Sequence, residues 1–159
     1  MPPTKARYGD NSMIILFLLN LLSTMYMTGL IWFVQIVHYP LHGEVGENSF
    51  QRYQEIHMRR TSWVVIPPML MELLTSVALW YFSPFGLFSE MFLGLLLCLV
   101  LIWLSTGFIQ APTHGILVHR FSKKLHNRLV VSNWIRTVLW SVRSLILLFI
   151  LNQLLSDLA

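Results

Sequence analysis

Histidine is the residue type in this chain with the widest scope for chemistry, and all six histidines lie in or beside two polar connections. Two short segments repeat each other, Pro40-Leu41-His42-Gly43 and Pro112-Thr113-His114-Gly115. Each is followed by a His-x-Arg triplet, at His57-Met58-Arg59 and at His126-Asn127-Arg128. Neutral imidazole is the commonest biological ligand for iron, copper and zinc. The pattern therefore suggests a metal or haem site where these segments meet.

The metal-ligand candidates are the histidines expected nearest to the ends of four apolar helices. They are His38, His42, His57, His114 and His126. Iron, copper or a haem held by two histidines would suit such a set. The alternative is that these side chains are structural, or bind lipid headgroups, because histidine is common where a helix leaves the membrane.

A second group of polar residues falls inside the apolar stretches. Glu72 and Arg143 both lie near the middle of such a stretch, and their residue numbers differ by 71. A charge at that depth is costly and usually faces a partner in the bundle interior, so we expect the two to pair. Asn133, Arg136, Trp140 and Arg143 fall on one helical stripe, which we expect to face inward. Glu72, Arg136 and Arg143 are accordingly the candidate catalytic residues.

Composition sets the class of protein that must position these groups. Of the 159 residues 55% are hydrophobic and 11% charged, and the mean hydropathy is +0.62. Four apolar runs, at about 13–37, 62–82, 87–109 and 132–155, are long enough to cross a bilayer as helices. The sequence predicts an all-α integral membrane four-helix bundle that forms one transmembrane domain over residues 1–159.

Charge distribution predicts the orientation in the membrane. Basic residues concentrate in the connections 38–61 and 110–131, which the positive-inside rule places in the cytoplasm. Both termini are then outside, and the compartment expected is the cell inner membrane. The net charge of +4 comes from residues that flank the spans, so nucleic acid is not an expected partner. The one cysteine, Cys98, leaves no internal disulfide.

Matching positions in the two halves suggest an internal repeat. Ile31-Trp32 and Ile102-Trp103 differ by 71 in residue number, as do Trp63 and Trp134. We therefore expect two tandem helical hairpins related by a pseudo-two-fold axis along the membrane normal.

Several segments resemble a group of small four-span bacterial membrane proteins of no established activity. They include the stretch Gln35-Ile36-Val37-His38-Tyr39-Pro40 and the stretch Asn133-Trp134-Ile135-Arg136-Thr137. The likeness extends over most of the chain. It implies a bacterial origin and a shared four-span architecture, and it implies no mechanism.

The sequence leaves three functions open. The first is a metal- or haem-dependent redox protein that acts on a lipid-soluble substrate such as a quinone, a sterol-like molecule or a carotenoid. The second is an accessory or assembly subunit that has other membrane subunits as partners. The third is a small transporter that works as a homodimer. In each case the lipid bilayer is the surrounding partner.

Overall fold

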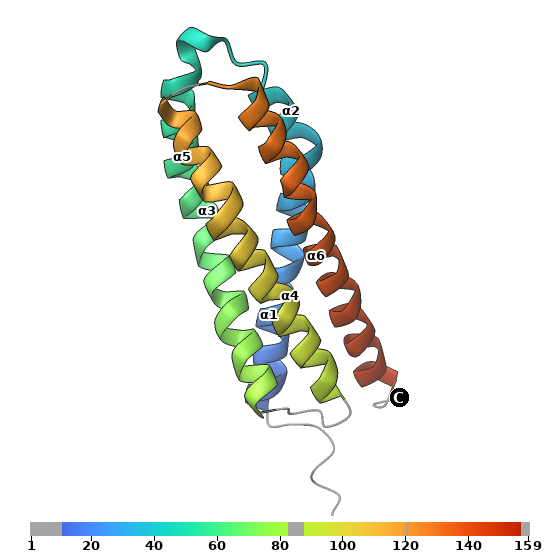
Figure 1. Cartoon of the computed structure of the whole chain (residues 1–159). Helices are drawn as coiled ribbons and strands as arrows, with labels where there is room; N and C mark the ends of the chain where they lie inside the picture. Colours follow the sequence, from blue (N-terminus) through green and yellow to red (C-terminus); the bar gives the residue numbers. More distant parts are fainter. Residues whose placement is uncertain (1–10, 83–87, 120, 157–159) are drawn as a thin grey trace, which may run out of the picture.

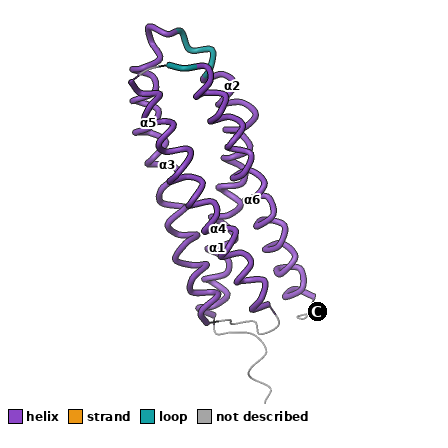
Figure 2. Tube along the Cα trace, in the orientation of Figure 1, coloured by secondary structure: helices purple, strands orange, loops and turns teal. Residues whose placement is uncertain are grey.

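In the computed structural model of the protein, residues 11–82, 88–119 and 121–156 are described, and within these ranges there are helices and no strand. The helices form four long rods (Figures 1 and 2). The first rod joins α1 (Asn11–Phe33), η1 (Val34–His38) and α2 (Tyr39–His42), and the second is α3 (Glu47–Phe82). The third joins α4 (Ser89–Ser105), η3 (Thr106–Gln110) and α5 (Ala111–His119), and the fourth is α6 (Lys123–Ser156). The expected all-α four-helix bundle is confirmed.

The rods pack in a ring in which each contacts two neighbours. The helix α1 packs against α3 and α6, and α4 packs against the same two helices. Helix α1 begins and helix α6 ends at the same end of the bundle, while the two histidine-containing connections lie at the opposite end (Figure 1). A tandem-hairpin symmetry between the halves stays a prediction, as does the expected cytoplasmic side.

All four rods are long and apolar enough to cross a membrane. Each contains at least 31 residues, which corresponds to a length of about 46 Å or more, whereas the hydrocarbon core is about 30 Å thick. Large apolar side chains are exposed along the outer surface, among them Leu22, Leu74 and Phe108. These features suit a bilayer, and they leave part of each rod to extend beyond the hydrocarbon.

Two of the rods contain a five-residue π-helical segment directly before a proline-containing turn. The segments η1 and η3 precede Pro40 and Pro112. Proline cannot donate a backbone hydrogen bond and clashes with the carbonyl group one turn earlier, and a widened turn relieves that clash. The segments begin 72 residues apart, which is also the spacing of the two Pro-x-His-Gly segments.

Pro67 and Pro68 behave differently. The sequence suggests a kink or local unwinding at this pair, which would free carbonyl groups beside Glu72. The structure keeps α3 continuously α-helical through both residues, so the unwinding does not occur.

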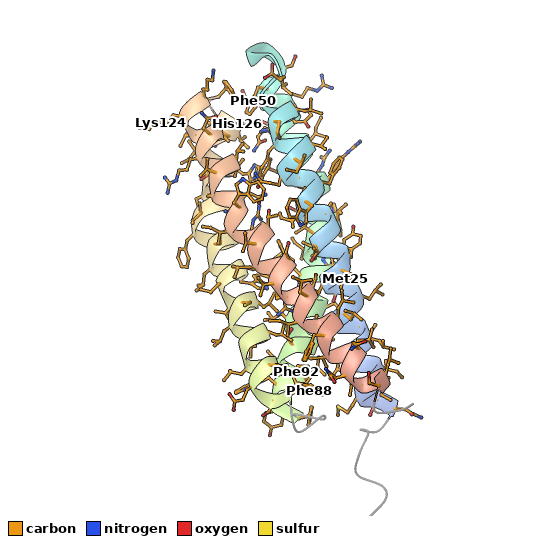
Figure 3. All side chains as sticks on the ribbon, turned by 90° about the vertical axis from the view of Figure 1, so that its right-hand side faces the viewer. Met25, Phe50, Phe88, Phe92, Lys124 and His126 are labelled. Atoms are coloured by element: carbon orange, nitrogen blue, oxygen red, sulfur yellow. The ribbon has the colours of Figure 1, made fainter. Side chains whose placement is uncertain are left out.

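The interior of the bundle alternates between apolar clusters and polar layers. One apolar cluster lies near the chain ends around Phe17 and Phe92, a second lies around Met27 and Trp140, and a third lies at the histidine end around Phe50. Figure 3 shows the two ends, with Phe92 near one and Phe50 and His126 at the other. Between the first two clusters lies a layer formed by Glu72 and Arg143.

Glu72 and Arg143 form the expected pair inside the bundle. The nearest nitrogen and oxygen atoms are 3.3 Å apart, and both side chains have no exposed surface. Glu72 also accepts hydrogen bonds from Thr24 (2.6 Å) and from the indole of Trp140 (3.0 Å). The helical stripe of α6 that includes Trp140 and Arg143 is buried, as predicted. Because both carboxylate oxygens accept hydrogen bonds from other helices, the pair acts as an interhelical clamp.

Removing the Glu72 carboxylate should strongly destabilise the bundle, because it leaves the Arg143 charge buried without a partner. We expect Glu72→Ala to lower the free energy of unfolding by about 3–5 kcal/mol, measured by denaturation in mixed detergent micelles. Glu90→Ala is the matched control, because Glu90 is an exposed acidic residue in the first turn of α4. Equal stability of the two variants would contradict the clamp.

Candidate functional site at the histidine end of the bundle

Five of the six histidines form one cluster at this end of the bundle. The ring centroids are 4.5 Å apart for His38 and His57, 5.7 Å for His57 and His114, and 5.4 Å for His42 and His126. These side chains come from all four rods. The sixth histidine, His119, is exposed. The structure thus brings together the whole set of metal-ligand candidates that the sequence suggests.

The cluster is not arranged as a metal centre. In residues 11–82, 88–119 and 121–156, no group of three or more His, Cys, Asp or Glu side chains could hold a metal ion. Two pairs of rings are stacked, with interplanar angles of 23° for His38 and His57 and 29° for His42 and His126. The expectation of iron, copper or haem gains no support from this geometry.

Gln54 determines the proton positions in the centre of the cluster. This fully buried amide lies on α3 and donates from Nε2 to the backbone carbonyl of His114 (3.2 Å) and to Nδ1 of the same residue (2.8 Å). A carbonyl oxygen can only accept, so the orientation of the amide is fixed. Nδ1 of His114 is therefore an acceptor and its proton is on Nε2. The amide oxygen accepts from Nε2 of His42 (2.7 Å), so Nδ1 of His42 is the unprotonated nitrogen.

Tyr39 and Arg136 continue this network toward the middle of the bundle. The Tyr39 hydroxyl accepts from Nε2 of His114 (3.1 Å) and from Nη2 of Arg136 (3.3 Å). Arg136 also donates from Nε and Nη2 to the side-chain oxygen of Asn133, and Nδ2 of Asn133 donates to the side-chain oxygen of Gln35 (2.8 Å). Arg136 is 8% exposed. Its hydrogen-bond partners in the described residues are neutral, which distinguishes it from Arg143.

His126 has a packing role at the edge of the cluster. Its Nε2 donates to the backbone carbonyl of Tyr39 (3.0 Å), and its ring lies over Gly43. A Cβ atom at position 43 would approach the ring to 2.8 Å, which is closer than real Cβ contacts. Glycine is needed here for close approach and not for its backbone angles, because φ is −71°.

A cavity of about 280 Å³ lies between the rods directly beneath the cluster. We call it the central cavity. Its polar lining includes Tyr39, His57, Gln110, His114 and Arg136, and its apolar lining includes Met27, Val65, Met69, Trp103 and Trp140. The polar groups lie at the histidine end, and the apolar groups line the side toward the membrane centre. A larger hollow on the outer face of α4 and α6, around Leu104 and Phe108, has almost entirely apolar walls. This outer hollow is apolar enough to accommodate lipid chains.

The predicted site residues fall into two groups, those that line the central cavity and those that do not. Of the candidate catalytic residues, Arg136 lines the cavity, whereas Glu72 and Arg143 lie in the enclosed clamp below it. Of the candidate metal ligands, His57 and His114 line the cavity. His38 and His42 lie behind them in the cluster, and His126 packs on Gly43.

Sequence reasoning missed the two residues that organise the network, Gln54 and Tyr39. One signal was available for Tyr39, because it lies three residues before His42 and is therefore its neighbour on a helical face. Gln54 carries no such signal, because a glutamine in a polar connection is ordinarily solvated.

No protein-family profile matches this chain, and no curated protein sequence or solved structure is significantly similar to it. The resemblance to small four-span bacterial membrane proteins therefore stays a prediction. The candidate site rests on the geometry above.

The contact between His126 and Gly43 predicts different outcomes for the two glycines of the Pro-x-His-Gly segments. Gly43→Ala should lower the melting temperature, because the new methyl group displaces the His126 ring. Gly115→Ala should leave it unchanged or raise it, because a Cβ atom there meets nothing within 4 Å and alanine favours the helix. Thermal unfolding in detergent measures both. A Gly43→Ala protein as stable as Gly115→Ala would refute the packing role of His126.

The central position of Gln54 predicts a large effect of its removal. Gln54→Ala deprives Nε2 of His42, Nδ1 of His114 and one backbone carbonyl of their partner. A buried polar group left unpaired costs about 1–3 kcal/mol, so we expect the free energy of unfolding to fall by at least that amount. Gln51→Ala, at an exposed position on the same helix, is the control and should change little. The network would be refuted if the two variants were equally stable.

Proposed function

We propose that this multi-pass membrane protein binds a lipid-soluble molecule with a polar head in the central cavity. The observation that carries the proposal is the two-sided lining of that cavity. Apolar walls with a few convergent polar groups at one end are typical of small-molecule sites. The proposal keeps the lipid-soluble partner expected from the sequence, and it does not depend on a metal or a haem.

The dimensions of the cavity constrain the ligand. Its volume of about 280 Å³ is just below the ~300–1,000 Å³ range of pockets that enclose drug-sized molecules. A compact molecule, or the head and first carbons of a longer one, fits this space. The polar head belongs beside His57, His114 and Arg136, and the apolar part belongs among Val65, Met69 and Trp103.

Exposed lining residues support access from the side of the bundle. Ser62 and Ile66 on α3 and Ala111 on α5 are exposed and also line the cavity. These two helices run side by side at the histidine end (Figure 1). An opening between them would allow a ligand dissolved in the membrane to enter without crossing the aqueous phase.

Filling the cavity should abolish binding without unfolding the protein. Two photoreactive ten-carbon probes, a carboxylic acid and an alcohol, are incubated with the detergent-purified protein, and labelled peptides are identified by mass spectrometry. At least one probe should label cavity residues such as Met58 or Ser62. Val65→Phe places a ring in the cavity and should reduce this labelling about tenfold or more, since a blocked site loses the binding energy of the ligand.

Val64→Phe is the matched control, because Val64 is exposed on the adjacent position of α3 and does not line the cavity. It should label as the unchanged protein does. If neither probe labels the cavity, or if Val65→Phe labels as well as Val64→Phe, the proposed function is wrong.

A further inference from the structure

The polar end of the central cavity contains hydrogen-bond donors that have no acceptor. The guanidinium of Arg136 uses Nε and Nη2 for Asn133 and Tyr39, and Nη1 has no partner within the described part of the chain. Arg136 lines the cavity, and Nη1 is not among the enclosed side-chain atoms that lack a partner. Its two N–H groups are therefore available to a ligand there.

The Tyr39 hydroxyl contributes a third unused donor. A phenol oxygen accepts up to two hydrogen bonds and donates one. Both acceptor positions are used, because Nε2 of His114 must carry its proton and Arg136 can only donate. The hydroxyl proton then has no acceptor among the described residues. The orientation of Gln54 thus makes the Tyr39 hydroxyl a donor at the edge of the cavity.

The positive charge of Arg136 also lacks a partner. Arg136 is nearly as buried as Arg143, but the one ion pair between described residues joins Arg143 to Glu72. A buried cation without a counter-ion is costly, because the interior of a bundle screens charge poorly. The surroundings of Arg136 supply neutral oxygens from Asn133 and Tyr39 and no negative charge.

We propose that the ligand of the central cavity has an anionic head, a carboxylate on a short apolar chain, which binds Nη1 of Arg136 and the Tyr39 hydroxyl. This inference rests on the proposed function. A carboxylate offers acceptors and no donors, and its single negative charge balances the single guanidinium. A phosphate dianion would leave excess negative charge at a site with one cation, and an alcohol would leave the charge of Arg136 unbalanced.

Comparison of the same two ten-carbon probes tests this directly in the unchanged protein. At pH 8 the acid is ionised and the alcohol is neutral, and their chains are equally apolar. We expect half-maximal labelling of the cavity at a concentration about tenfold lower for the acid, since charge-assisted hydrogen bonds are roughly twice as strong as neutral ones. Equal labelling by both probes would overturn the anionic head while leaving the proposed function intact. Labelling by neither would overturn the proposed function itself.

Variants of Arg136 assign the preference to this residue. Arg136→Gln should remove the preference for the acid, so that the two probes reach half-maximal labelling at similar concentrations, and Arg136→Lys should retain a reduced preference. The lysine variant also covers the case in which Arg136→Gln does not fold. Arg128→Gln is the control, because Arg128 is an exposed arginine on the same helix. An acid preference that survives in Arg136→Gln, or that is lost in both Arg136→Lys and Arg128→Gln, would refute the assignment.

Discussion

The bundle depends on how it accommodates positive charge in a low-dielectric interior. Arg143 is placed between Glu72, Thr24, Ser76 and the backbone carbonyl of Leu95, which together provide a counter-ion and hydrogen-bond acceptors. This layer joins all four rods. Lipid tails are as apolar as the side chains between helices. In a bilayer, apolar contact alone therefore gives little preference for one packing of the helices over another. A polar layer in which Arg143 is paired with Glu72 and hydrogen bonds join the rods supplies that preference.

Arg136 lies two helical turns away on the same face of α6 and is accommodated in another way. Its partners are amide and hydroxyl groups, and these belong to a network that reaches through Tyr39, His114 and Gln54 to His42. The first layer is closed and the second adjoins a cavity. The two arginines on this helix therefore have different surroundings, since Arg143 belongs to an enclosed ion-paired layer and Arg136 borders the central cavity.

Much of this arrangement follows from sequence. Charge and hydropathy indicate four spans, and the cost of burying Glu72 and Arg143 indicates that they pair. The inward stripe of α6 follows from helical periodicity. The grouping of five histidines follows from their positions at the ends of four packed helices.

What the sequence does not determine is the chemistry of that group. Ligation depends on where each ring nitrogen points, and this is set by contacts such as Gln54 with the His114 carbonyl, between residues 60 positions apart. Proximity of imidazoles is predictable from helix ends, whereas convergence of their lone pairs is not. The central cavity was likewise beyond prediction, because it results from how side chains of all four rods fill the space between them.

The two π-helical segments have a consequence for how this end of the bundle is built. Each accommodates about one residue more than an α-helical turn would, and one residue corresponds to a rotation of about 100° around the helix axis. Below η1 the first rod presents Met27 and Ile31 to the interior, and beyond it the rod presents Tyr39 and His42. The extra residue rotates one portion of the rod relative to the other. Shortening the rod by one residue at η1 would therefore turn the histidine portion toward lipid. The packing of both portions of the rod therefore constrains its length at η1.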